Sequence, residues 1–168
     1  VSVDLDHERQ LGATIAEVAA EKAGIIKPGA ALVVGRLPAE AERVVDAAAA
    51  AAGVAPRRGR DATVDVEAAG GSCAITVRTA SGTYGPVRLA LAGRHQVDNA
   101  VVAVLALEAL AERGHRIPAS AVEAGLSSAR WPVRLQWIED GDGQILIDGA
   151  HNPAGARALA SYLLESGL

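Results

Sequence analysis

The sequence predicts an α/β fold, and three patterns along the chain support this. In the first third, short apolar runs alternate with segments of helical character, an order that favours a parallel sheet. In the middle, apolar residues recur at every second position between turns, which is typical of an antiparallel hairpin or meander. In the last third, a long apolar helix precedes a second helix, a buried strand and a final helix.

The composition is that of a globular protein. Of the 168 residues, 50% are hydrophobic, 21% are charged and only 2% are aromatic, so small aliphatic residues must build the core. The length accommodates one domain, or one domain plus the start of a second. The net charge of −4 argues against nucleic acid as the main partner. The lone Cys73, which we assign to packing, fits a cytoplasmic location, and no signal peptide or membrane span is visible.

The first part of the chain carries the parallel α/β pattern. Residues 1–5 alternate as a strand already in progress would, and the chain has no methionine, so we expect a segment of a longer polypeptide. Thr14 and Glu17 form a capping box that starts a helix of two to three turns, and Gly24 suits its C′ position. A short buried strand is expected over 31–35 and a helix over 39–52.

The remaining elements are expected in the following order. Three alternating strands lie around residues 64–66, 75–77 and 87–91. An apolar helix over 97–113 ends at Gly114, a second helix covers 119–128, a buried strand covers 145–147, and Asn152-Pro153 caps a helix over 153–165.

Lys22 and His7 are the first candidates for chemistry. Lys22 falls on the apolar face of its helix, at the spacing set by Ile15, Val18 and Ala19. Burial disfavours the charged ammonium, and a neutral amine can act as a nucleophile or take up carbon dioxide as a carbamate. The alternative is a lysine that snorkels off the helix edge. His7 follows a strand end among acidic residues, where it is either a metal ligand or a hydrogen-bonded loop residue, and imidazole suits softer metals than magnesium.

His95 and Asn99 lie four residues apart and share a face at the start of the apolar helix. The free backbone N–H groups and the positive end of the helix dipole lie there as well. The functional interpretation is a nucleotide contact, with Asn99 hydrogen-bonded to the edge of a base. The alternative is helix capping and the satisfaction of polar groups in the core.

Arg134, Asp148 and His151 are candidates in the last third. Arg134 stands between the two tryptophans and suits a phosphate clamp because its planar fork binds in a bidentate way; a surface salt bridge is the alternative. Asp148 and His151 follow a strand and precede a helix, a junction that lies at the ligand crevice of α/β sheets. Asp148 could hold a ribose hydroxyl there, and His151 could approach a phosphate or acyl group.

Four blocks of the chain together resemble folylpolyglutamate synthases and bifunctional dihydrofolate synthases, which belong to the Mur-ligase superfamily of ATP-dependent amide-bond-forming enzymes. The blocks follow one another in the order of that family. They are Asp6-His7 with Leu11-Gly12 and residues 21–25; residues 93–100; Trp131-Pro132 with Arg134-Leu135; and residues 148–153.

The resemblance implies a reaction, its cofactors and its partners. ATP would phosphorylate a carboxylate of folate or dihydropteroate, and the amino group of L-glutamate would attack the acyl phosphate. ATP and Mg²⁺ are the implied cofactors and a monomer the implied state, with neither nucleic acid nor membrane as a partner. Residues 1–130 would form the latter part of a Mur-ligase-type P-loop ATPase domain, and residues 131–168 the hinge and the beginning of a Rossmann-like C-terminal glutamate ligase domain.

The resemblance also implies roles for single residues. His7 would be a magnesium ligand, and Lys22 would be the carbamylated lysine that helps to hold a second magnesium ion. Asn99 would contact adenine. Arg134 would reach the γ-phosphate from the inter-domain hinge. Asp148 and His151 would close on the nucleotide and the acyl phosphate.

The chain departs from the family pattern in two respects. The glycine-rich P-loop and the acidic magnesium ligand that lies between it and His7 are absent from the 168 residues, and Val133 stands where a glycine usually precedes the hinge arginine. We therefore expect this segment alone to bind ATP poorly and to be inactive. Two alternatives are a Mur-type ligase acting on a cell-wall precursor and a degenerate, non-catalytic domain kept for packing or partner binding.

Overall fold

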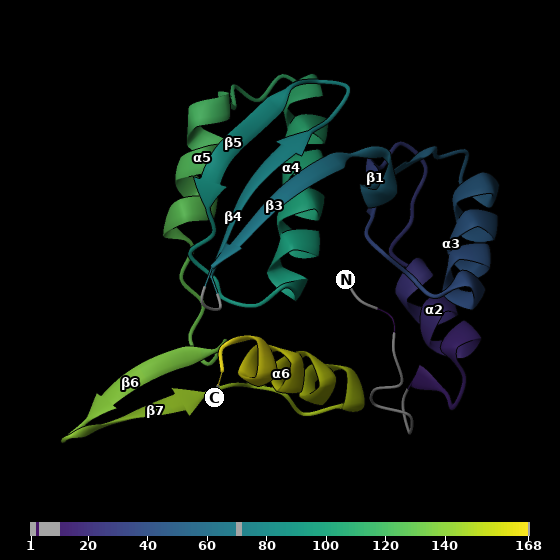
Figure 1. Cartoon of the computed structure of the whole chain (residues 1–168). Coiled ribbons are helices and arrows are strands. Elements are labelled where there is room, and N and C mark those ends of the chain that lie inside the picture. The colour runs from purple at the N-terminus through teal and green to yellow at the C-terminus, as the bar shows by residue number, and fades with distance from the viewer. Residues whose placement is uncertain (1–2, 4–10, 70–71, 168) are drawn as a thin grey trace. The chain divides into compact units, whose positions relative to one another are not determined.

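The computed structural model describes residues 3, 11–69 and 72–167, in two compact units (Figure 1). The first unit comprises Val1–Ala62 and Val101–His115, and the second comprises Thr63–Ala100 and Arg116–Leu168. Helix α4 (His95–Glu112) contributes residues to both.

The first unit begins with helix α2 (Ile15–Ala23), which the predicted capping box starts. The hydroxyl of Thr14 accepts from the Glu17 amide at 3.2 Å, and the Glu17 carboxylate accepts from the Thr14 amide at 3.1 Å. The predicted role of Gly24 is wrong in detail: it is the C-cap residue itself, and its φ of −57° is right-handed. Of the strand expected over 1–5, only Val3 is described; it lies outside any strand and is buried against α2.

Strand β1 (Leu32–Val34) pairs in parallel with β2 (Pro56–Arg58), and helix α3 (Ala39–Ala51) connects them. The expected parallel pairing of strands is therefore present in this unit, but β1 pairs with a strand that was not expected, and the strand expected over 1–5 lies almost entirely outside the described residues. The sequence pattern does not predict strand β2, because the strand has only three residues, one proline and two arginines, and no apolar run marks it. Helices α2 and α3 pack through small side chains, which suits a core with almost no aromatic residues. The side chains at this contact that have no solvent exposure are Val18, Ala19 and Ala41.

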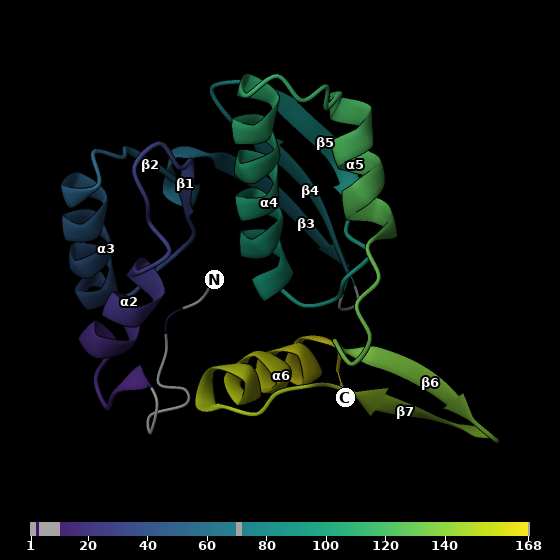
Figure 2. The ribbon, with the colours of Figure 1, turned by 180° about the vertical axis from the view of Figure 1, so that it is seen from behind.

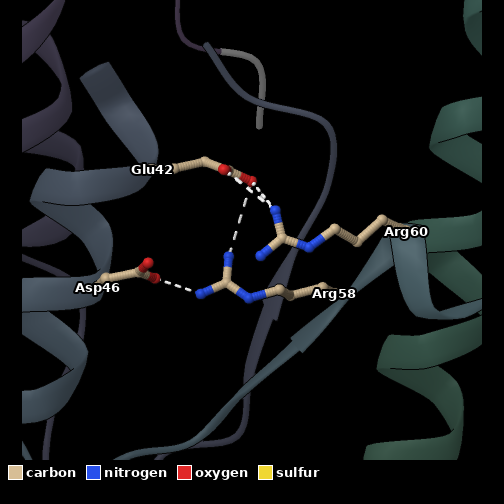
Figure 3. A network of polar contacts seen from close by, with 4 residues as sticks. All are labelled: Glu42, Asp46, Arg58 and Arg60. Carbon is tan, nitrogen blue, oxygen red and sulfur yellow. Dashed lines mark hydrogen bonds and ion pairs between the residues drawn. The ribbon is translucent and has the colours of Figure 1, made fainter. Parts of the chain in front are cut away.

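A network of ion pairs ties α3 to Arg58 at the end of β2 and to Arg60 in the turn that follows (Figure 3). Arg58 pairs with Asp46, and Arg60 donates to both oxygens of Glu42 at 2.8 and 3.1 Å. The Nη1 atom of Arg58 is buried 3.8 Å from Glu42, too far for a hydrogen bond. Because the Arg58 side chain is only 15% exposed, these carboxylates compensate for the cost of removing its charge from water.

The second unit contains the predicted meander, β3 (Thr63–Ala69), β4 (Ser72–Arg78) and β5 (Thr83–Arg88). Helix α5 (Ala119–Ser128) packs on β5 (Figure 2). Alternate residues of β4, namely Cys73, Ile75 and Val77, are buried, so the assignment of Cys73 to packing is confirmed.

Helix α4 begins at His95, two residues before the predicted start. The Gln96 amide donates to the carbonyl of Gly93 at 3.0 Å, which forms the turn that leads into the helix. The predicted end at Gly114 is confirmed, since this residue has a φ of +94° that favours glycine. Within the described part of the chain, no helix combines the length and the hydropathy needed to cross a membrane.

The last elements are the antiparallel hairpin of β6 (Gln136–Asp140) and β7 (Gly143–Ile147), and helix α6 (Pro153–Glu165). The Asn152 side chain caps α6 by accepting from the Gly155 amide at 2.8 Å, as predicted. The predicted strand over 145–147 is present within β7, but its predicted burial is wrong, since Ile145 is 47% exposed.

We predict that Arg58→Met lowers the free energy of unfolding by about 1–3 kcal/mol, because Asp46 and Glu42 lose a cation in a half-buried setting. Chemical denaturation measures the change. Arg78→Met is the matched control: the Arg78–Asp65 pair is exposed, so its removal should change stability by at most about 0.5 kcal/mol. Equal effects of the two substitutions would show that the α3 network does not stabilise the first unit.

Candidate nucleotide site

Most of the predicted site residues lie in the second unit. His95 and Asn99 are in the first turns of α4, Arg134 is in the loop before β6, and Asp148 and His151 are in the loop between β7 and α6. The hairpin of β6 and β7 brings these two loops together, since Gln136 pairs with Ile147.

The Asp148 carboxylate joins the two loops. Its Oδ2 atom accepts from the backbone N–H of Leu135 at 3.0 Å, and its Oδ1 atom accepts from the backbone N–H of Ala150 at 2.8 Å. A third bond runs in the opposite direction, from the Gly149 amide to the Val133 carbonyl at 2.9 Å. Each carboxylate oxygen keeps a second lone pair, so a ribose hydroxyl could still donate to Asp148.

The backbone on both sides of Arg134 is left-handed. Val133 has a φ of 62° and Leu135 a φ of 46°, a region that β-branched and bulky residues rarely adopt. The Gln136 side chain accepts from the Val133 amide at 3.0 Å, and Leu135 is buried. The glycine of the family pattern would take this conformation without strain, so here the surrounding bonds must hold Val133 in place.

The Leu135 side chain reaches the start of α4. A Cβ atom added to Gly93 would lie 2.9 Å from Leu135 Cδ1 and 2.8 Å from His95 Cε1, so only glycine fits between them. The loop that carries Arg134 therefore packs directly against the turn that leads into α4. Leu135 belongs to one of the four blocks of the family resemblance, but this packing role was not predicted for it, because nothing local distinguishes it from a core leucine.

His95 lies among charged groups of the site. Burial lowers the pKa of its imidazole, Asp148 and Asp98 raise it, and Arg134 lowers it, with a net downward shift. The ring is therefore neutral at physiological pH. Arg134 itself is exposed and forms no ion pair with the described residues, so the surface salt bridge considered for it is not found among them. A planar guanidinium fork in this position has the chemistry to bind a phosphate in a bidentate way.

Asn99 is exposed, and its Nδ2 atom donates to Oε1 of Gln96 at 2.9 Å. The alternative to a nucleotide contact, in which Asn99 satisfies a polar group of the protein, is thus present, but this hydrogen bond uses only one N–H of the Asn99 amide. His151 is also exposed, and its Nδ1 atom lies 2.8 Å from the Gly149 carbonyl oxygen, to which it donates.

The two residues of the predicted metal site lie elsewhere. Lys22 is in α2 of the first unit, where it is half-buried beside the buried Ala23. His7 falls outside the described residues. Among the described residues, no group of three His, Cys, Asp or Glu side chains could hold a metal ion.

Comparison with known proteins finds relatives of one kind. The dihydrofolate synthase/folylpolyglutamate synthase of Mycobacterium tuberculosis is 35% identical over 96% of this chain, and that of Bacillus subtilis is 36% identical over 98%. The chain spans only 35% and 39% of these two proteins. No protein-family model matches the sequence.

Solved structures agree with these relatives. An FPGS–AMPPCP–folate complex superposes with a TM-score of 0.89 at 34% identity, covering 98% of this chain and 40% of the other. The M. tuberculosis folylpolyglutamate synthase complexed with ADP and AMPPCP gives a TM-score of 0.86 at 34% identity, covering 98% and 38%. The α/β fold class expected from the Mur-ligase resemblance is therefore confirmed.

Proposed function

This chain belongs to the family of folylpolyglutamate and dihydrofolate synthases. We propose that it is the part of an ATP-dependent glutamate ligase that closes over the bound nucleotide. The ligase would add L-glutamate to folate, to dihydropteroate, or to both. The observation that carries the proposal is the hydrogen bond that Asp148 accepts from Leu135 in the loop of Arg134, together with the packing of Leu135 against the turn before α4. In this proposal the phosphate-binding loop would lie outside these 168 residues, which contain no Gly-Lys-Ser/Thr sequence.

The residues of the second unit would bind and orient the nucleotide. Asn99 would hydrogen-bond the adenine edge, and Asp148 would accept from a ribose hydroxyl. Arg134 would place its fork on the γ-phosphate as charge develops there, and His151 would approach the acyl phosphate. Phosphoryl transfer demands positioning and electrostatic stabilisation more than covalent help from the protein, which suits such a set of side chains.

Magnesium would supply charge neutralisation at the phosphates. Its proposed ligands are His7 and a carbamylated Lys22, and Lys22 fits this hard cation only as a carbamate, because an amine offers no oxygen. A half-buried lysine on the packed face of α2 is compatible with this modification. A cytoplasmic location and a monomeric state stay predictions from the sequence.

We predict ATP-dependent addition of L-glutamate by the protein that carries this chain, measured as ADP release and as the mass of the product. Dihydropteroate and tetrahydrofolate are the test acceptors, and a muramoyl precursor tests the cell-wall alternative. Arg134→Ala should lower kcat by about 10²- to 10³-fold, because one preorganised cation is lost from the transition state. Arg130→Ala, an exposed arginine four residues earlier, should leave kcat unchanged.

Three results would contradict this proposal. Transfer to the muramoyl acceptor alone would favour the cell-wall ligase, and no ATP-dependent transfer to any acceptor would favour the degenerate domain. Measurable ATP hydrolysis by residues 1–168 alone would contradict the view that the phosphate-binding loop lies outside them.

We further predict a carbamate on Lys22. Intact-mass analysis after carbon dioxide trapping, with magnesium present, should show a gain close to the mass of one CO₂ per chain. Lysines occur only at positions 22 and 27, so two variants separate them. The gain should disappear in Lys22→Arg and persist in Lys27→Arg. A gain that survives in Lys22→Arg, or none in the unaltered chain, would contradict the assignment.

A further inference from the structure

Gln96 is a buried polar residue to which the proposed reaction gives no role. It is only 8% exposed, in the first turn of α4. Its amide lies between two residues of the site: Oε1 is 2.9 Å from Nδ2 of Asn99, and Nε2 is 3.1 Å from Nε2 of His95. The side chain therefore connects the exposed Asn99 to the half-buried imidazole.

The types of atom in this chain of contacts fix the direction of each bond. An amide nitrogen donates and does not accept, so Nε2 of Gln96 donates to His95, whose Nε2 atom must carry no proton. The proton of the neutral imidazole is then on Nδ1. At the other end, Asn99 gives one N–H to Gln96. Its carbonyl oxygen and its second N–H stay available on the exposed side.

We propose that Gln96 is a positioning residue that sets which atoms of the Asn99 amide face the nucleotide base. The proposal rests on the assignment of Asn99 to adenine under the proposed function. Gln96 touches no substrate in this scheme. It acts by holding the Asn99 amide in one of its two orientations, with the neutral His95 as the fixed end of the chain of bonds.

The orientation of an asparagine amide matters for the choice of base. Adenine presents a donor at N6 beside an acceptor at N7, and an asparagine amide can satisfy both in a bidentate pair. A 6-oxo purine such as hypoxanthine presents an acceptor where adenine has the donor. An amide held with its oxygen toward N6 therefore favours adenine, and the reversed amide does not.

Protonation of His95 would reverse the chain of bonds. A protonated imidazole donates from both nitrogens, so Gln96 would have to turn its oxygen toward His95 and its nitrogen toward Asn99. Asn99 would then turn as well and exchange its outward atoms. The charged groups that face His95 are Asp98 on α4 itself, and Arg134 and Asp148 from the two loops. Burial and Arg134 lower the pKa of the ring and outweigh the two carboxylates, which raise it.

The first test uses the 168-residue chain without nucleotide. In ¹⁵N-labelled protein, the side-chain amide resonances of Gln96 and Asn99 should shift with the same midpoint as the His95 ring as the pH is lowered below 6.5. In Gln96→Leu, His95 should still titrate while Asn99 no longer follows it. Gln144→Leu is the matched control on the exposed hairpin, where Gln144 contacts Glu139, and it should leave the coupling intact.

Absence of a shared midpoint in the unaltered chain would overturn the proposal, and that result needs no variant. An Asn99 amide that still follows His95 in Gln96→Leu would overturn it as well. Neither result depends on ATP binding, so failure here is distinguishable from failure of the proposed function.

The second test measures base selectivity in the complete ligase. In Gln96→Leu, the ratio of kcat/KM for ATP over inosine triphosphate should fall by about tenfold or more. Gln96→Glu keeps an acceptor for Asn99 and should keep the ratio. A purely structural role for Gln96 would lower activity with both nucleotides equally and leave the ratio unchanged, which would contradict the proposal.

Discussion

The arrangement of the site depends on one carboxylate. Asp148 accepts from the N–H of Leu135 across the base of the hairpin and from the N–H of Ala150 within its own loop. Hydrogen bonds to a charged acceptor are worth more than those to a neutral one, roughly 1.5–3 kcal/mol each. This is enough to hold a segment with two left-handed, non-glycine residues in a single conformation.

The hydrogen bond between Asp148 and Leu135 also affects the packing at the start of α4. With Leu135 fixed, its side chain contacts the Gly93 turn, and Arg134 lies close enough to His95 for its charge to lower the pKa of the imidazole. His95 in turn contacts Gln96, and Gln96 contacts Asn99. Residues proposed to bind the phosphate, the ribose and the base are thus linked within the second unit by hydrogen bonds and by the packing of Leu135 against the Gly93 turn. A family member with glycine at position 133 would need less support for the same loop.

Local patterns predicted the local structure well. The capping box of Thr14 and Glu17, the alternation in β4 and the Asn152-Pro153 start of α6 each depend on residues close in sequence, and all three are present. The tie between Leu135 and Asp148 could not be predicted in this way. It requires the register of β6 with β7, and β6 was not expected because its residues are exposed and follow no alternation.

Among the site residues, too, some could be predicted from the sequence and others only from the structure. Resemblance to a family pointed to Asn99, Arg134 and Asp148, and the structure places them in the same unit. Gln96 was passed over, since a glutamine inside a helix start has no meaning until its burial and its two partners are known. His7 lies outside the described residues, so its role stays a prediction.

Amide hydrogen exchange at Leu135 tests the central claim most directly. If Asp148 holds the loop that carries Arg134, the Leu135 amide is protected from exchange at neutral pH. Asp148→Asn should then speed its exchange by at least about tenfold, because the amide loses a hydrogen bond to a charged group. The Leu89 amide, which donates to the Cys73 carbonyl within the meander, should not change. An unprotected Leu135 amide, or equal exchange in the two proteins, would contradict the account.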